Sequence, residues 1–433
     1  MKERIMHVIE RIAPQEISFS DQWTLYSNII DSSINEYISE VNKNSLKQLL
    51  LAFLREGILP YHYQNSTVIF DLRRSNYFMY VNRVKLFSLL RFTSFDSLIL
   101  KHKTTSVKQT ITDPLKLLDI VKIELRSVLN MEQWVKFYKE VANHLQNALL
   151  STWKKYSIGK LISRSKRKSH SLLNVLKSPQ VSANSSLQFE QSVFSGHPYH
   201  PCAKTKLGFT IEDTINYSPE FQFKVGIFIA AVKKEYAHIE AMQFNINFTE
   251  WFANYYPDAW EAWEQELKKN NLEIKNYIPF PVHPWQVYYF TFISPLFKDY
   301  LEKKIIVLLD KAKVIASPTL SFRTLLPIEN INAPYIKLPV AIQATSIVRT
   351  LSPISTKNMP KISGMLKKIL ETENYFSNRL DVLPESYGLH LKGLNSDQAQ
   401  HFTAIFRDNI SNYLAADEVA IVVAAFFEKS FMS

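Results

Sequence analysis

Two histidines and two lysines lie close together between residues 197 and 206. His197 and His200 each precede a proline, which disfavours helical geometry and favours extended or polyproline geometry. Because that geometry has three residues per turn, the two imidazoles are expected on the same side. Lys204 and Lys206 then add two ammonium groups. We interpret this segment as a candidate cradle for a polyanion.

Two other interpretations of the segment stay open. His197, His200 and Cys202 could bind zinc, although no second Cys/His cluster completes a four-ligand site. The histidines could also be ordinary loop residues whose prolines only fix a turn. The other polar segments favour the polyanion interpretation.

The segment 317–325 reads Ser-Pro-Thr-Leu-Ser-Phe-Arg-Thr-Leu. Strand alternation would place Thr319, Ser321 and Arg323 on one face, so that two hydroxyl donors lie beside a guanidinium. Such a set suits phosphate oxygens. The alternative is the polar face of a half-exposed strand.

A further polar set follows between residues 337 and 349. Thr345 and Arg349 are four residues apart, so they share a side in either a helix or a strand. Lys337 adds another cation. The alternative is a solvated polar edge on a buried element.

Glycine-rich phosphate loops are excluded by the sequence. The chain holds eight glycines in 433 residues and contains neither GxGxxG nor GxxxxGK[ST]. A nucleotide would therefore have to be held by side chains.

The net charge of +11 is concentrated in one stretch. Residues 151–186 carry eight lysines and arginines and no acidic residue, together with ten serines. We interpret the stretch as a solvated linker or loop, with a polyanion contact as the alternative. Nucleic-acid binding is disfavoured, because no recognition module accompanies the charge.

The elements around these segments predict an α+β fold. Residues 1–150 carry apolar stripes at helical spacing, interrupted by strand-like residues 66–72 and 77–81. Short β-type runs and helices alternate from 187 to 357, and residues 358–433 are predicted to be helical. We thus expect a helical N-terminal domain (1–150), a linker (151–186), a sheet-containing central domain (187–357) and a helical segment (358–433).

Composition suggests where the protein works. Its one cysteine, Cys202, excludes an intramolecular disulfide framework and fits a reducing compartment. No apolar run approaches the ~18 residues of a membrane span. We expect a cytoplasmic protein with no membrane partner.

Four motifs together suggest a family. GHPxHPxxKxKxG, PxHPWQ, SxRTL and KLPxxxxxTSxxR occur in this order from Gly196, Pro281, Ser321 and Lys337. In this order and at these separations they resemble the IucA/IucC family, the siderophore synthetases that work without a nonribosomal peptide template. The resemblance runs from about residue 180 to 428. Lys206 stands where the family usually has Arg, so a bidentate contact would become a point charge.

The resemblance implies an ATP-dependent ligase that adenylates citrate or a related carboxylate and passes the acyl group to an amine or hydroxyl. By that similarity Ser321, Arg323 and Thr324 hold the triphosphate and Lys337 assists at the nucleotide. His200 contacts the α-phosphate region, and Thr345 and Arg349 face the carboxylate. The resemblance thus marks His200 and Arg349 as catalytic. His197, Lys204 and Lys206 are also assigned to ATP.

The chain also departs from the family pattern. Members continue into a palm-like region with an EAHxQN-type motif and acidic residues that hold Mg²⁺, and no Glu-Ala-His occurs here. The resemblance therefore implies a truncated cupped-hand architecture whose Mg²⁺ ligands lie in the missing C-terminal region, with none assigned in this chain. A homodimer or a complementing C-terminal chain is the expected assembly. The alternative is an inactive relative or fragment that keeps a nucleotide or anion pocket.

Overall fold

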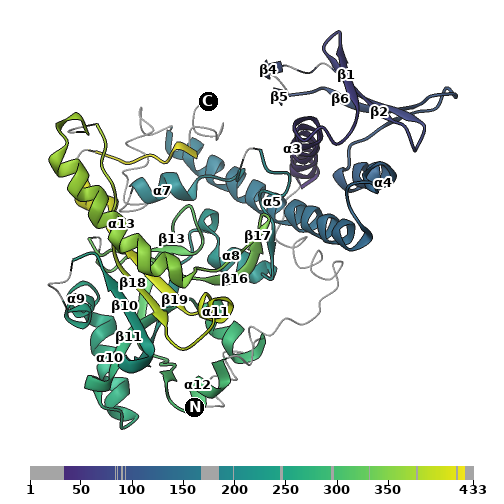
Figure 1. The fold of residues 1–433 in the computed structure, drawn as a ribbon. Helices are drawn as coiled ribbons and strands as arrows, with labels where there is room; N and C mark the ends of the chain where they lie inside the picture. The colour runs from purple at the N-terminus through teal and green to yellow at the C-terminus, as the bar shows by residue number, and fades with distance from the viewer. Residues whose placement is uncertain are drawn as a thin grey trace.

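A computed structural model describes residues 34–424, except residues 83, 85, 89–90, 93, 167–184, 198, 244–246, 294–296, 331, 377–378 and 416–417. Figure 1 shows a small N-terminal sheet set apart from a larger central sheet, with the long helix α5 between them. Helices and strands are mixed throughout, as the α+β prediction requires. In the described residues, no helix is long and apolar enough to cross a membrane.

The N-terminal part combines three helices with an antiparallel sheet. Helix α3 buries Leu46, Leu49, Leu50, Phe53 and Leu54, the stripe whose spacing predicts a helix. The strand-like interlude is larger than predicted, because five strands pair in the order β1-β2-β3-β6-β7. The elements are α3 (Ile34–Arg55), β1 (Tyr61–Gln64), β2 (Thr67–Leu72), β3 (Tyr77–Asn82), β4 (Leu86–Ser88), β5 (Arg91–Phe92), β6 (Ser97–His102), β7 (Lys108–Thr110), α4 (Pro114–Leu125) and α5 (Met131–Lys166).

The predicted linker is wrong over its first part. Helix α5 runs through residue 151 and ends at Lys166, so residues 151–166 are helical. Trp153 packs beside Leu150 and Phe221, and the Ser151 hydroxyl donates to buried Glu220 at 2.6 Å. Lysine is a good helix former, so basic, serine-rich composition alone did not identify a loop. Residues 167–184 lie outside the described residues, and α7 (Ser185–Gln191) follows.

The central sheet holds nine strands in the described part of the chain. Their order is β10-β18-β19-β15-β14-β13-β9-β11, with β12 paired to β9, and each printed pair is antiparallel. The strands are β9 (Val225–Lys233), β10 (Ala237–Ala241), β11 (Tyr277–Val282), β12 (Ile306–Val307), β13 (Lys313–Pro318), β14 (Thr324–Pro327), β15 (Tyr335–Lys337), β18 (Glu385–Leu391) and β19 (Thr403–Arg407). Every residue of β11 is buried, so this sheet forms the main core.

Helices cover the central sheet, and a small second sheet lies beside it. Helix α10 packs Trp263 and Leu267 into the core, as its helical spacing predicts, and α13 lies over β18 (Figure 1). The small sheet has the order β17-β16-β8. The remaining elements are β8 (Lys206–Leu207), α8 (Ile211–Tyr217), η1 (Pro219–Phe221), η2 (Lys234–Tyr236), α9 (Phe248–Tyr255), α10 (Pro257–Lys269), η3 (Ile274–Asn276), α11 (Pro284–Tyr288), η4 (Tyr289–Ile293), α12 (Lys298–Glu302), β16 (Val340–Ala344), β17 (Ile347–Arg349), α13 (Pro353–Thr372), η6 (Asn374–Phe376), α14 (Ser396–Ala399) and η7 (Ile410–Tyr413).

The prediction of a helical segment over 358–433 is only partly correct. Helix α13 ends at Thr372, after which β18 and β19 join the central sheet between β10 and β15. Their residues are almost all buried, so tertiary pairing decides their conformation. Near the end of the predicted helical segment, the described residues 418–424 do not form an α-helix, and residues 425–433 lie outside the described residues.

Candidate functional site

The segment Thr319–Arg323 is a tight turn between β13 and β14, and the predicted strand alternation is therefore wrong. The Thr319 amide donates to the Thr324 carbonyl at 2.9 Å, and the Thr324 amide donates to the Ser321 carbonyl at 2.9 Å. Helix α7 fixes the turn from outside, because the Glu190 carboxylate accepts from the Leu320 amide at 2.9 Å. Ser321, Arg323 and Thr324 thus come together around a turn instead of along one face.

Arg323 leaves this turn toward strand β17. Its Nη1 donates to the Thr350 carbonyl at 2.7 Å, one residue after the end of β17. Its own carbonyl accepts from the Leu338 amide at 2.8 Å, so the backbone is fixed as well. Burial and then the nearby Arg349 guanidinium lower the pKa of Arg323. Two arginines therefore share one site.

Lys337 lies on β15 between β14 and β19. Its Nζ is 3.7 Å from Glu385 Oε1, and Arg407 Nη2 is 2.7 Å from the same oxygen. Burial lowers the pKa of Lys337, Arg407 and Arg323 lower it further, and Glu385 opposes them. One carboxylate is thus shared by two cations.

The β16–β17 hairpin brings Thr345 and Arg349 together, although across a turn. Thr345 adopts a φ of +58° at the hairpin tip, a conformation that L-residues rarely take. Arg349 Nη2 donates to Thr345 Oγ1 at 2.8 Å. The next residue, Ser346, is 2.8 Å through its Oγ from His200 Nε2. The hairpin therefore links the carboxylate-binding candidates to the histidine segment.

The histidine segment forms turns, and the expected polyproline strip is wrong. The His200 amide donates to the His197 carbonyl at 3.3 Å, and the Cys202 amide donates to His200 Nδ1 at 3.0 Å. Burial and neighbouring cations lower the pKa of His200, which favours a neutral ring whose Nε2–H faces Ser346. His197 is exposed, with its Nδ1 accepting from the Tyr199 amide at 3.3 Å.

The zinc interpretation finds no support in this geometry. Within the described residues, no group of three or more His, Cys, Asp or Glu side chains could hold a metal ion. Cys202 is buried, and burial raises the pKa of its thiol to about 12. A thiol that stays protonated is a poor zinc ligand.

Lys204 and Lys206 are buried against Glu220, a set that we call the buried triad. Lys204 Nζ is 3.1 Å and Lys206 Nζ 3.6 Å from Glu220 Oε1, and Lys206 also donates to Ser218 Oγ at 2.7 Å. Burial alone would raise the pKa of Glu220, but the two ammonium groups outweigh it and hold that pKa below its usual value. Burial lowers the pKa of Lys206 to about 8. The structure therefore does not bring these lysines to the arginines.

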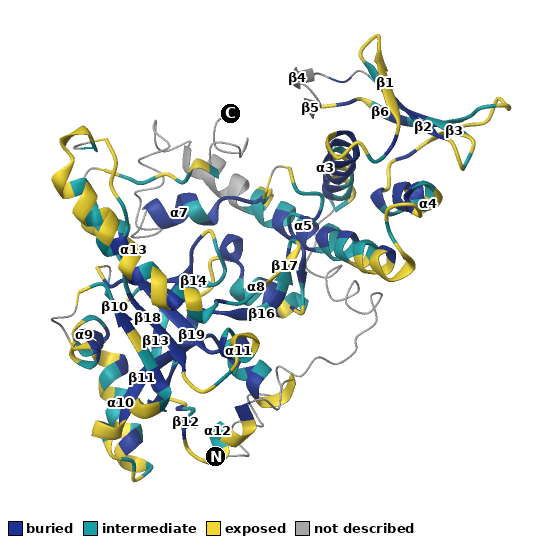
Figure 2. Cartoon of the chain, viewed as in Figure 1, coloured by how far each residue is buried: buried dark blue, intermediate teal, exposed yellow. Residues whose placement is uncertain are grey.

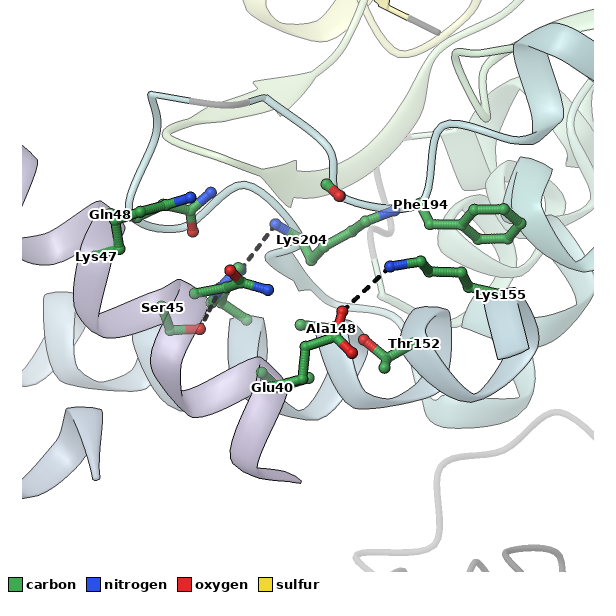
Figure 3. A pocket seen from close by; sticks show the side chains of 13 residues that line it. Glu40, Ser45, Lys47, Gln48, Ala148, Thr152, Lys155, Phe194 and Lys204 are labelled. Atoms are coloured by element: carbon green, nitrogen blue, oxygen red, sulfur yellow. Dashed lines mark hydrogen bonds and ion pairs between the residues drawn. The ribbon is translucent and has the colours of Figure 1, made fainter. Parts of the chain in front are cut away.

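A polar pocket lies on the other side of Lys204, between α3 and α5 (Figure 3). Its volume is about 350 Å³, and Glu40, Ser45 and Lys155 line it with Lys204. Lys155 pairs with Glu40 at 3.1 Å, so opposite charges meet within it. None of Arg323, Lys337 or Arg349 lines this pocket.

The PxHPWQ motif is structural in its described contacts. His283 caps helix α11 by accepting from the Trp285 amide at 3.1 Å, and both side chains are buried. Trp285 packs with Phe209 and Ile342, as expected of a tryptophan that anchors a core. The motif thus supports the small sheet that carries Arg349.

The set Arg323, Lys337, Arg349 and Arg407 forms what we call the cation cluster. Glu385 pairs with Lys337 and Arg407, and the charge of Arg407 also acts on Glu190, whereas Arg323 and Arg349 donate to the Thr350 carbonyl and the Thr345 hydroxyl. Cations that repel one another are stabilised by an added anion, and arginine forks match phosphate and carboxylate oxygens. The cluster can therefore hold a polyanion such as a triphosphate.

Comparison with known proteins agrees with this chemistry. The model of the IucA / IucC family matches residues 185–428, which is more than half of the chain and includes the whole cation cluster. The chain belongs to the IucA / IucC family.

Three relatives show how much of the family's length the chain spans. Staphyloferrin A synthase from Staphylococcus aureus (strain NCTC 8325 / PS 47) is 34% identical over 219 residues, 50% of this chain and 35% of that enzyme. Citryl-spermidine/3,4-dihydroxybenzoyl-citryl-spermidine:spermidine ligase from Bacillus anthracis is 25% identical over 411 residues, 91% of this chain and 61% of that enzyme. ATP-bound aerobactin synthetase IucA from Klebsiella pneumoniae shares the fold with a TM-score of 0.62 at 20% identity, over 85% of this chain and 61% of that one. In each case the chain spans less than two thirds of the relative.

The cation cluster of this IucA / IucC family member includes residues that the motifs do not mark. Arg407 follows the buried run Ala404–Phe406, and a charged residue at the end of such a run was the available signal. Glu385 and Glu190 come from outside the motifs, on β18 and α7. Glu220 gave no signal, because only the fold brings it beside Lys204 and Lys206.

Proposed function

We propose that this chain forms the nucleotide- and carboxylate-binding part of an ATP-dependent acid–amine ligase of siderophore biosynthesis. The observation that carries the proposal is the cation cluster, in which four cations converge with two carboxylates among the described residues. The ATP-bound state of one relative and the citryl and spermidine groups in another relative's name support ATP, a citrate-like acid and an amine as the reactants.

The proposed reaction has two steps. A carboxylate oxygen of the acid attacks the α-phosphorus of ATP, the bond to the bridging oxygen breaks, and pyrophosphate leaves. An amine or hydroxyl then attacks the acyl carbon, loses its proton to solvent, and displaces AMP. The first step needs the repulsion between two polyanions to be offset, which is the task of fixed cations.

The residues divide between the reactants as follows. Arg323 donates to phosphate oxygens in place of the Thr350 carbonyl, with the Ser321 and Thr324 hydroxyls beside it and Lys337 at the nucleotide. Arg349, oriented by Thr345, binds the carboxylate. His200 donates its Nε2–H to the α-phosphate region in place of Ser346. Exposed His197 stays a proposed contact at the nucleotide.

Lys204 and Lys206 receive a different part in the proposal. Their ammonium groups contact Glu220, so we assign them to positioning the 197–206 segment and not to binding ATP. Mg²⁺ is also treated separately. Within the described residues, no group of three or more His, Cys, Asp or Glu side chains could hold a metal ion, and no step is assigned to a metal.

The test is pyrophosphate release with ATP, citrate, Mg²⁺ and hydroxylamine as a surrogate nucleophile. We expect the 433-residue chain alone to release pyrophosphate near background and to gain citrate-dependent release when a chain with the remaining part of the family fold is added. In-line attack needs reacting atoms held within roughly 3–3.5 Å, and we propose that the rest of the family fold contributes groups that hold them there. Strong citrate-dependent release by the chain alone would contradict the need for a partner.

The alternative is an inactive relative that keeps an anion pocket. It predicts ATP binding without pyrophosphate release even after complementation. A chain that binds no ATP would contradict both functions.

A further inference from the structure

Helix α13 faces solvent with its large apolar side chains. Ile354, Ile362, Met365, Leu366 and Ile369 are all exposed, Ile354 by 66% and Met365 by 64%. At 100° per residue they fall within about one third of the helix circumference. Figure 2 shows this helix exposed along the outside of the fold. We call these five residues the apolar stripe.

The opposite side of α13 is built from small and polar residues. Its buried positions are Thr356, Pro360 and Ser363. The Thr356 hydroxyl lies 2.8 Å from His390 Nδ1, and the Ser363 hydroxyl accepts from the Glu385 amide at 3.0 Å. A Cβ at Gly388 would collide with the Thr356 carbonyl, so helix and strand are in close contact. The usual amphipathic arrangement of a surface helix is therefore inverted.

The inversion implies that the outer side is covered in the working protein. A stripe of large apolar residues along one helix is more than the single exposed residues normal on a surface. The helix that carries the stripe is also joined to the cation cluster through its inner side, because Ser363 accepts from the amide of Glu385, whose carboxylate pairs with Lys337 and Arg407.

The comparisons indicate which polypeptide this is. The chain matches the Bacillus anthracis ligase over 91% of its own length but over 61% of the ligase's length. More than a third of that ligase therefore lies outside the part that matches this chain. We propose that the apolar stripe of α13 is the docking surface for this remaining part of the family fold, on the same or a separate polypeptide. The inference rests on the complementing part in the proposed function and adds where it binds.

The charges beside the stripe specify the partner's chemistry further. Lys357, Lys361 and Lys368 follow one edge of the stripe at helical spacing, and all three are exposed. Lys361 is 3.4 Å from Glu240, so the other two carry most of the free charge along this edge. The partner surface is therefore an apolar face bordered by carboxylates on one side.

The test places a photo-crosslinking p-benzoylphenylalanine at Met365 in the full chain, made in the cells that naturally produce it. Met131 is the matched control, a methionine that is 61% exposed on the N-terminal part. We expect the Met365 probe to cross-link to sequence from the part of the IucA / IucC fold that this chain does not span, and the Met131 probe not to. Cross-linking to a second copy of the chain, to an unrelated protein or to nothing overturns the proposal.

A variant measures the contribution of the stripe independently of catalysis. Met365→Glu should weaken association with the cross-linked partner at least tenfold in the absence of nucleotide, whereas Met131→Glu should leave it unchanged. Because both side chains are exposed, both variants should keep the parent's melting temperature and ATP affinity. Unchanged association of Met365→Glu overturns the docking surface. If the parent chain does not bind ATP, the proposed function is contradicted, but the effect of Met365→Glu on association still tests the docking surface.

Discussion

The buried triad and the cation cluster both hold cations from the motifs, yet they differ in burial and in the partners of those cations. In the triad, Lys204 and Lys206 share the buried carboxylate of Glu220, which also accepts from Ser151. In the cation cluster, Lys337 and Arg407 share Glu385, whereas Arg323 and Arg349 donate to the Thr350 carbonyl and the Thr345 hydroxyl. A cation whose charge is compensated internally stabilises the fold, and one whose charge is not compensated is available for a ligand.

A basic motif therefore does not by itself mark a ligand contact. Lys204 and Arg323 both belong to motifs whose resemblance to the family implies ATP binding. The difference lies in Glu220, which belongs to η1 and meets the lysines only in the folded chain. Variants in the two regions should therefore differ in how much they lower the free energy of unfolding.

The largest effect is expected at the buried triad. Glu220→Gln should lower the free energy of unfolding by about 3–5 kcal/mol, because it leaves two buried ammonium groups without a countercharge. Urea unfolding of the variant and of Glu212→Gln, a matched change in α8, measures it. A loss below about 1 kcal/mol would mean that Glu220 does not compensate the lysines.

The pH dependence of the free energy of unfolding should show that His144, beside the buried triad, is neutral in the folded chain. His144, whose Nδ1 accepts from the Lys204 amide at 3.0 Å, has its pKa lowered by burial to about 3, from 6.5 when unfolded. Between these values the unfolded chain binds the extra proton, so stability present above pH 6.5 is lost as the pH falls. The slope is about 1.4 kcal/mol per pH unit.

His144→Gln removes that titration and serves as the comparison. The stability advantage of the parent over the variant should shrink by about 2 kcal/mol between pH 6 and pH 4.5. Unfolding curves at both pH values check it. A difference that stays constant with pH would show that His144 is not held neutral.

The smallest effect on stability is expected at the cation cluster. Arg349→Gln should change the free energy of unfolding by no more than about 0.5 kcal/mol, because it removes one part-buried hydrogen bond to Thr345 and, with it, a cation that Arg323 repels. Thermal unfolding measures it. A loss as large as that of Glu220→Gln would remove the distinction between the two regions.

The sequence predicted most of the core elements and the broad α+β class. An apolar stripe predicted within residues 1–150 corresponds to α3, and the alternation of helices and β-type runs predicted over 187–357 includes α10 and β9. These are long periodic segments, where local pattern and burial agree. Residues 151–166 and strands β18 and β19 were mispredicted, because composition in the first case and long-range strand pairing in the second decide the structure.

The grouping of the proposed site's cations was only partly predictable. The structure brings Arg323 near Lys337 and Arg349, through a turn and a hairpin where strands with polar faces were among the expectations. Arg407 and Glu385 meet them only because β19 pairs with both β15 and β18. A single sequence carries no signal for such pairings between distant strands.

Calorimetric titration of the chain with ATP measures whether the cation cluster binds the triphosphate. The parent should bind ATP, and Arg323→Ala should bind it more weakly by about 1.5–3 kcal/mol, the range for charge-assisted hydrogen bonds, with an unchanged melting temperature. Lys298→Ala, at an exposed lysine on α12, is the matched control and should bind as the parent does. Equal ATP affinity in the parent and Arg323→Ala would contradict binding of the triphosphate by the cation cluster.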